Sequence, residues 1–193
     1  MLGIFLDTET SGLDPKKHKI LELAFKIICL TTGQTLETFS QLIAIDSSDW
    51  QQSDKTSLQI NGLSWDTLQQ GKPLGEVQKL VHAIFKKWQL VRGKAVFICQ
   101  NPSFDRSFFS QIMDIPMQES LLIPYHWLDL ASMYWGYAMA QHLTPPWETG
   151  FTKDKIAARF HIPSEALPHR ALHGVDHLLK CYEAMLGFPK KPS

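Results

Sequence analysis

The first ten residues constrain the fold most, because they place two carboxylates at the end of an apolar strand. Residues 3–6, Gly-Ile-Phe-Leu, have the composition of a buried strand, and Asp7, Thr8 and Glu9 follow directly. Side chains two apart in an extended strand point to the same face, so Asp7 and Glu9 hold their carboxylates side by side. Turn-forming residues come next, at positions 10–15. The pattern predicts two like charges where a strand opens into a loop, and a hard cation such as Mg²⁺ or Mn²⁺ would neutralise them.

Size and composition indicate one globular unit. The 193 residues are 44% hydrophobic and carry a formal net charge of zero, which is enough apolar content for one buried core. We expect a single domain over residues 1–188 and a short tail at 189–193. The neutral charge argues against a protein that grips long tracts of nucleic acid through many Lys and Arg contacts. It is compatible with an enzyme that holds one strand end through metal ions.

Cysteine usage and hydropathy predict a cytoplasmic protein without a membrane segment. Cys29, Cys99 and Cys181 lie in apolar runs and show no zinc-binding spacing, as expected of buried free thiols in a reducing cytosol. The first residues lack the basic and apolar regions of a signal peptide, and no apolar run is long enough to cross a membrane.

Hydrophobic periodicity predicts hairpins first and then alternating strands and helices. A polar loop is expected at 46–56 and an irregular loop at 141–152. The expected strands are 3–7, 19–30, 36–45, 94–99 and 125–130, and the expected helices include 74–88, 104–113, 130–140, 153–160 and 172–186. This order predicts an α/β fold with a mixed sheet flanked by helices.

Two further polar residues extend the acidic pair. Asp105 follows the strand at 94–99 and begins a helix, so its carboxylate can face the same end of the sheet as Asp7. His169 follows a proline and precedes an apolar helix, so a loop presents its imidazole beside the carboxylates. Helix capping is the alternative role for Asp105, and packing against its own helix is the alternative for His169.

Three segments resemble the exonuclease motifs of the DEDD superfamily, histidine subclass. They are Phe-Leu-Asp-Thr-Glu-Thr-Ser-Gly-Leu at 5–13, Asn-Pro-Ser-Phe-Asp at 101–105 and His-Arg-Ala-Leu at 169–172. That group includes the proofreading epsilon subunit of bacterial DNA polymerase III, RNase T and oligoribonuclease. The resemblance covers nearly the whole chain in the right order, and it implies a ribonuclease H-like fold with a five-stranded mixed sheet and helices on both sides.

The resemblance also implies a chemistry and a set of site residues. The family removes nucleotides from a 3′ end with two divalent metal ions, Mg²⁺ or Mn²⁺. By position, Asp7, Glu9 and Asp105 would hold the metals, and His169 would be the general base. Thr10 and Leu13 would lie under the terminal nucleotide, with an apolar wedge against the last base. Both assignments follow only from the resemblance.

The chain departs from the family pattern at its fourth carboxylate. The pattern has Asp five residues after the histidine, where this chain has Gly174. Asp176, seven residues after, is the candidate for the fourth catalytic and metal-binding carboxylate. Two extra helical residues rotate a side chain by about 200° and move it by roughly 3 Å. Asp176 therefore reaches the metals only if the helix starts late or is distorted. His173 is a second candidate for the fourth ligand, although imidazole suits magnesium less well than carboxylate does.

These patterns together predict a 3′-5′ exonuclease that acts on single-stranded DNA ends in proofreading or repair. Exonuclease activity on short RNA or tRNA ends is the enzymatic alternative. The second alternative is a catalytically degenerate module of the same fold that binds nucleic acid or protein. The resemblance to the epsilon subunit makes a DNA polymerase a candidate partner, although we expect no long docking tail after the last helix.

Overall fold

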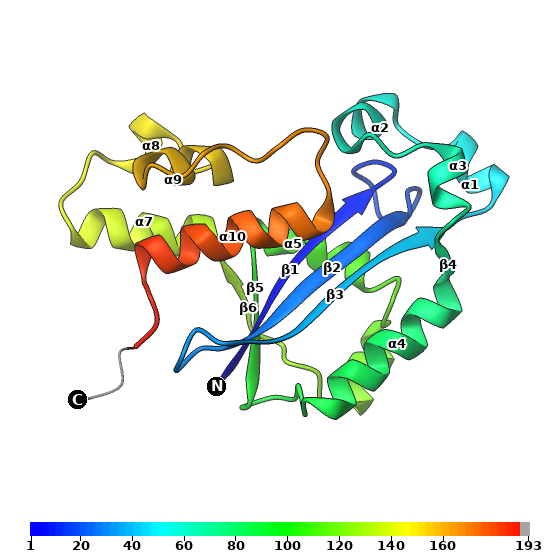
Figure 1. The fold of residues 1–193 in the computed structure, drawn as a ribbon, viewed down its shortest axis with the longest axis horizontal. Helices are drawn as coiled ribbons and strands as arrows, with labels where there is room; N and C mark the ends of the chain where they lie inside the picture. The colour runs from blue at the N-terminus through cyan, green and yellow to red at the C-terminus, as the bar shows by residue number, and fades with distance from the viewer. Residues whose placement is uncertain (190–193) are drawn as a thin grey trace.

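A six-stranded mixed sheet forms the centre of the fold in the computed structural model, which describes residues 1–189 (Figure 1). Its first three strands form an antiparallel meander, and the later strands run parallel to their neighbours. The strand order across the sheet is β4-β3-β2-β1-β5-β6. The strands are β1 (Leu2–Thr10), β2 (Ile20–Cys29), β3 (Thr35–Ala44), β4 (Lys72–Pro73), β5 (Ala95–Cys99) and β6 (Trp127–Asp129).

The expected α/β fold with a mixed sheet and flanking helices is confirmed, but the sheet has six strands where we expected five. The additional strand, β4, has only two residues, which pair with Ile43 and Ala44 at the end of β3. A two-residue strand is too short to produce a hydrophobic alternation, so the sequence gives no sign of it.

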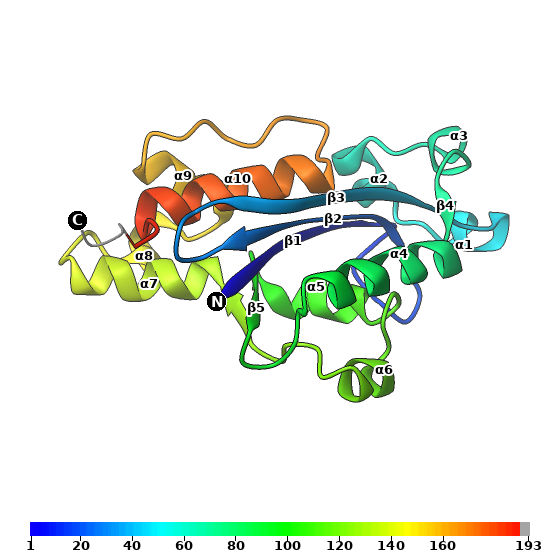
Figure 2. The same ribbon diagram turned by 60° about the horizontal axis from the view of Figure 1, so that its bottom comes forward.

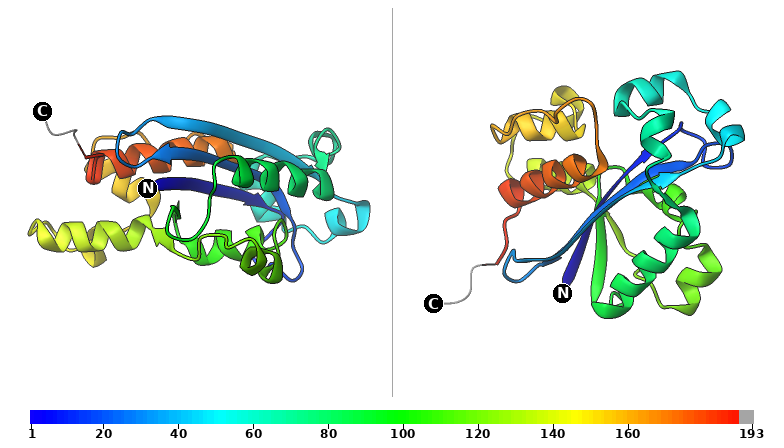
Figure 3. Two further views of the ribbon diagram at one scale, coloured as in Figure 1. Left: turned by 90° about the horizontal axis from the view of Figure 1, so that it is seen from below. Right: turned by 45° about the vertical axis from the view of Figure 1, so that its right-hand side comes forward.

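Helices cover both faces of the sheet, as Figure 2 shows for α10 and α4. Ile4 and Leu6 of β1 pack toward one face, in a core shared with α4 (Leu74–Lys87) and α5 (Pro102–Phe109). Phe5, between them, packs toward the other face. There the core is shared with α7 (Leu130–Ala140), α9 (Lys153–Arg159) and α10 (Ala171–Met185). Figure 3 shows the strands between these two layers of helices.

Short helices occupy segments that we expected to be irregular. The polar stretch at 46–56 contains α1 and the start of α2, because the side chains of Asp46 and Asp54 cap them by accepting hydrogen bonds from Asp49 N and Ser57 N. The loop at 141–152 contains one turn of helix. The short helices, in these two segments and elsewhere in the described residues, are α1 (Ser47–Gln51), α2 (Lys55–Asn61), α3 (Trp65–Leu68), α6 (Ile115–Ser120) and α8 (Pro146–Thr149).

The long helices start and end close to the predicted positions, except that the helix expected at 104–113 is displaced and shorter, as α5. Cys99 and Cys181 are buried free thiols, whereas Cys29 is partly exposed. No helix within residues 1–189 combines the length and the apolar character that a membrane crossing needs. Of the predicted tail at 189–193, residues 190–193 lie outside the described part of the chain.

Candidate active site

Strand β1 carries Asp7 and Glu9 on the face that α10 covers. The strand continues through both residues, because Glu9 and Thr10 still pair with β2. Asp7 and Glu9 therefore point to the same face of the strand as Phe5, whose ring belongs to the core under α10. Thr8 points to the opposite face. The side chain of Asp7 is 18% exposed, and Glu9 is buried.

Helix α5 brings a third carboxylate to this end of the sheet. Asp105 lies in the first turn of α5, directly after β5, and is buried. Thr8 Oγ1 donates a hydrogen bond of 2.8 Å to Asp105 Oδ1 and so ties the helix to β1. Asn101 occupies the N-cap position, so Asp105 does not cap its helix.

The loop before α10 presents His169. Its backbone N–H donates to Ile60 O at 3.0 Å, which links the loop to the end of α2. The next residue, Arg170, forms two hydrogen bonds to Glu22 of β2, at 2.9 and 3.1 Å, and Ala171 N donates to the same carboxylate at 3.2 Å. Glu22 therefore anchors the start of α10.

Four of the predicted site residues line one cleft of about 200 Å³: Asp7, Glu9, Asp105 and His169. Two residues that the sequence did not indicate also line it. Lys153 is the first residue of α9, and Glu165 lies in the loop between α9 and α10. The glycine at position 174 was the one available signal, because a missing carboxylate suggests that another acidic residue takes its place.

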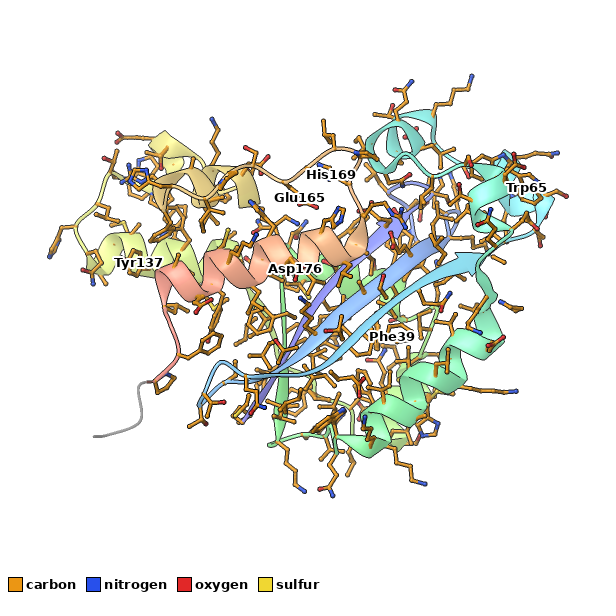
Figure 4. All side chains as sticks on the ribbon, in the orientation of Figure 1. Phe39, Trp65, Tyr137, Glu165, His169 and Asp176 are labelled. Atoms are coloured by element: carbon orange, nitrogen blue, oxygen red, sulfur yellow. The ribbon has the colours of Figure 1, made fainter. Side chains whose placement is uncertain are left out.

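The structure does not bring Asp176, the expected fourth ligand, into the cleft, because α10 turns its side chain away. The helix is regular from its start, with Gly174 N donating to Arg170 O at 3.0 Å, so neither a late start nor a distortion brings Asp176 round. Asp176 instead pairs with Lys26 of β2. His173 lines the same outer hollow as Asp176. Figure 4 shows Glu165 and His169 on the loop that passes along α10, with Asp176 on the helix itself.

The carboxylate of Asp7 lies where a side chain at position 174 would begin. A Cβ atom on Gly174 would stand 1.8 Å from Asp7 Oδ2 and 3.1 Å from Lys153 Nζ. The glycine therefore allows Asp7 to turn toward α10 and leaves room for the lysine.

Lys153 and Glu165 form a buried ion pair beside Asp7. Lys153 Nζ is 2.7 Å from Glu165 Oε2 and 3.9 Å from Asp7 Oδ2. The Glu165 side chain is 3% exposed, and its Oε1 has no hydrogen-bond partner within residues 1–189. Burial lowers the pKa of Lys153, but Asp7 and Glu165 outweigh it and raise that pKa overall, so the ammonium stays charged.

The three acidic residues have strongly perturbed pKa values. Burial raises the pKa of Asp7 to about 7, against the opposing effect of the Lys153 ammonium. Burial and the neighbouring Asp7 raise the pKa of Glu9 to about 8. Burial and Asp7 also raise the pKa of Asp105 well above its usual range. Without a further cation the cleft therefore holds protons at neutral pH.

The donor atoms suit a hard divalent metal, although the side chains are not preformed around one. Within residues 1–189, no three His, Cys, Asp or Glu side chains stand as a cluster that could hold a metal ion. Asp7 is turned toward Gly174 and Lys153. Its oxygens and those of Glu9 and Asp105 are nevertheless the ligand type that Mg²⁺ and Mn²⁺ prefer. Burial is the main cause of their raised pKa values, and a bound divalent cation would favour the ionised carboxylates.

The two residues expected beneath the substrate differ in their exposure. Thr10 is buried, and its hydroxyl donates to Gly12 O at 2.8 Å, so its side chain shapes the turn. Leu13 is 76% exposed. With Ile60 it lines a hollow at the surface, and its role as an apolar wedge stays a prediction.

An exposed aromatic cluster, Trp135, Trp147 and Phe151, lies beside the cleft. The Trp135 ring centre is 5.2 Å from that of Trp147 and 5.9 Å from that of Phe151. Trp135 and Phe151 share a hollow with Asp129, whose Oδ1 accepts from the cleft residue Asn101 through its N–H at 3.0 Å. The hollow beside Trp135 and Phe151 and the acidic cleft therefore share a wall at Asn101 and Asp129.

Comparison with known proteins identifies a family. The model of the RNase_T family, described as Exonuclease, matches residues 4–182. No curated protein sequence matches the chain.

Solved structures share the fold at low identity. The 3′-exonuclease in "3'-end specific recognition of histone mRNA stem-loop by 3'-exonuclease" has a TM-score of 0.71 at 14% identity, over 96% of this chain and 63% of that one. The nuclease domain of 3′hExo, a DEDDh family member bound to rAMP, has a TM-score of 0.68 at 14% identity, over 96% and 90%. E. coli Exonuclease I in complex with a dT13 oligonucleotide has a TM-score of 0.74 at 15% identity, over 95% and 41%.

These likenesses confirm the ribonuclease H-like exonuclease fold. The chain spans 63% of the histone mRNA 3′-exonuclease and 41% of Exonuclease I. The finer resemblance to the epsilon subunit and RNase T stays a prediction.

Proposed function

The chain belongs to the exonuclease family, and from this premise we propose that it is a metal-dependent 3′-5′ exonuclease acting on single-stranded DNA ends. We infer that residues 1–188 form the catalytic domain. Exonuclease activity on short RNA or tRNA ends is the alternative substrate choice. Proofreading or repair remains the proposed setting, and a DNA polymerase remains a proposed partner.

The observation that carries the proposal is the meeting of four residues from three distant segments in one cleft. Asp7 and Glu9 come from β1, Asp105 from α5 and His169 from the loop before α10. These are the residues that the family motifs place in the reaction. Their order along the chain and their common cleft make a chance grouping of surface charges a poor explanation.

The divalent ions, when bound by Asp7, Glu9 and Asp105, would supply positive charge at the phosphate and at the departing 3′ oxygen. Thr8 fixes Asp105 through their hydrogen bond, so that this carboxylate keeps its position. His169 borders the cleft, and we assign its imidazole the removal of the proton from the attacking water.

The surface around the cleft suits a single strand. Leu13 offers an exposed apolar edge on one side, and the aromatic cluster offers exposed flat rings on another. Bases of any identity can stack on such rings. We propose that unpaired bases of the substrate contact Trp135, Trp147 and Phe151 while the 3′ end lies in the acidic cleft.

The proposal is tested with purified protein, 5′-labelled single-stranded DNA and RNA of matched sequence, and Mg²⁺, Mn²⁺ or EDTA. We expect a ladder that shortens from the 3′ end in metal and is absent in EDTA. Asp7→Ala should remove the activity, whereas Asp176→Asn should keep it. A faster reaction on RNA would select the alternative substrate, and full turnover by Asp7→Ala would contradict the site assignment.

Gly174 supports a second candidate function, a binding module that has lost its catalysis. The family carboxylate is missing at that position, and Lys153 occupies the neighbouring space. Binding of labelled DNA or RNA without cleavage in either metal would favour this module.

A further inference from the structure

The family's fourth carboxylate is absent from α10, and the cleft contains an acidic side chain that no family motif supplies. We propose that Glu165, from the loop between α9 and α10, takes over as the fourth metal-binding carboxylate, with Lys153 as the cation that holds it in place until metal binds. The inference rests on the proposed metal-dependent activity and adds a specific residue to it.

With glycine at position 174, helix α10 supplies no carboxylate there, and Asp7 occupies the space instead. The volume next to Gly174 is filled by Asp7 Oδ2, 1.8 Å from where a Cβ would lie. The glycine removes one negative charge from the cleft, and Glu165, which also lines the cleft, returns one. A carboxylate thus reaches the same cleft from a different chain segment.

The burial of Glu165 indicates a ligand rather than a surface charge. Its side chain is 3% exposed, and Oε1 has no hydrogen-bond partner among the described residues. An unpartnered buried carboxylate oxygen is costly unless something occupies it. A divalent cation in the cleft would satisfy this oxygen.

The loop that carries Glu165 is tied down at three points. Glu165 N donates to Asp154 Oδ1 of α9 at 3.0 Å. Before it, Pro163 O is 2.8 Å from His177 Nε2 of α10, and after it, His169 N donates to Ile60 O at 3.0 Å. These anchors fix the backbone on both sides of Glu165, which is a requirement for a metal ligand on a loop.

Lys153 explains how four carboxylates coexist without metal. Its ammonium is 2.7 Å from Glu165 Oε2 and 3.9 Å from Asp7 Oδ2, so it neutralises part of the repulsion between them. A divalent ion would contact the same two carboxylates. Metal binding and the lysine therefore compete for Glu165 and Asp7.

Direct measurement of Mn²⁺ binding separates this role from a structural ion pair. Mn²⁺ affinity of the full chain is measured by calorimetry and by the EPR signal of free Mn²⁺, for wild type, Glu165→Gln, Lys153→Met, Asp7→Asn and Asp176→Asn. We expect Glu165→Gln to bind Mn²⁺ at least tenfold more weakly and Lys153→Met to bind it as tightly as wild type or more tightly. Asp176→Asn is the matched acidic control and should leave the affinity unchanged.

The direction of the two effects decides the question. A purely structural pair is broken equally by either substitution, so equal weakening by Glu165→Gln and Lys153→Met would overturn the proposal. Unchanged binding by Glu165→Gln would also overturn it. If Glu165→Gln binds like wild type while Asp7→Asn does not, only this inference fails. If wild type binds no Mn²⁺, the proposed function fails as well.

A rescue variant guards against a folding defect in Glu165→Gln. The double variant Glu165→Gln with Gly174→Asp returns a carboxylate to the family position, and the Asp7 side chain has to rotate away from it. We expect Mn²⁺ affinity to recover at least tenfold over Glu165→Gln alone. No recovery, together with a normal melting curve in EDTA, would contradict replacement of one carboxylate by the other.

Discussion

Replacing Glu9 by Gln should stabilise the metal-free protein at alkaline pH. Burial and the charge of Asp7 raise the pKa of Glu9 from 4.5 to about 8. In the folded state this group stays protonated between those values, whereas in the unfolded chain it ionises. The contribution of Glu9 to the free energy of unfolding is therefore most favourable below pH 4.5. It falls as the pH rises and reaches its minimum above pH 8.

The size of the effect follows from that pKa difference. At pH above 8 the full pKa difference corresponds to a loss of unfolding free energy on the order of 5 kcal/mol. Relaxation of the cleft and entry of water reduce the cost of a buried charge. We therefore expect Glu9→Gln to gain about 2 kcal/mol at pH 8.5, which is a rise of roughly 4–8 °C in Tm for a chain of this size.

Thermal unfolding in EDTA, followed by circular dichroism at pH 5 and pH 8.5, measures this gain. The difference between Glu9→Gln and wild type should be small at pH 5 and large at pH 8.5. Glu148→Gln changes an exposed glutamate of α8 and is the control, with no expected pH-dependent gain. Equal differences at both pH values, or a loss of stability in Glu9→Gln at pH 8.5, would refute the electrostatic reasoning.

Three further predictions concern metal, positioning and substrate. Mg²⁺ at 100 times its Kd should add about 2.7 kcal/mol to wild-type stability at pH 8.5, and Asp7→Asn should lose this gain in the same melting experiment. Thr8→Val removes the hydrogen bond to Asp105 and should lower the free energy of unfolding in urea by about 1–3 kcal/mol. The same substitution at the exposed Thr38 is the control and should not lower it. Trp135→Ala should weaken single-stranded DNA binding about fivefold or more in an Asp7→Asn background, as expected when a stacking ring is lost. Tyr125→Ala, at an exposed ring that contacts Arg92, should leave that binding unchanged in the same titration.

The sequence predicted those parts of the site that depend on local pattern. Asp7 and Glu9 were placed by strand alternation, and Asp105 by the start of a helix directly after a buried strand. Because β5 runs parallel to β1, the carboxyl ends of both strands lie at the same edge of the sheet. His169 was placed because the following apolar helix fixes the end of its loop.

The remaining features depend on contacts between distant segments. Tyr134 is fully buried and its neighbour Trp135 is 41% exposed, but both lie in a helix that is apolar on all sides, so the sequence pattern does not separate them. The regular start of α10, which turns Asp176 outward, depends on the bonds from Arg170 and Ala171 to Glu22. Glu22 lies about 150 residues earlier, and no local pattern records such a contact.

The position of Glu165 shows why an active-site charge can move between chain segments without loss of the fold. A metal ion responds to the position and charge of an oxygen, whichever element carries it. The loop before α10 passes along the same cleft that the helix faces, and it is held by backbone contacts to α2, α9 and α10. A glutamate side chain, one methylene longer than aspartate, extends the reach of this loop. The acidic cleft can therefore keep four carboxylates with glycine at position 174, provided that Lys153 offsets their repulsion in the absence of metal.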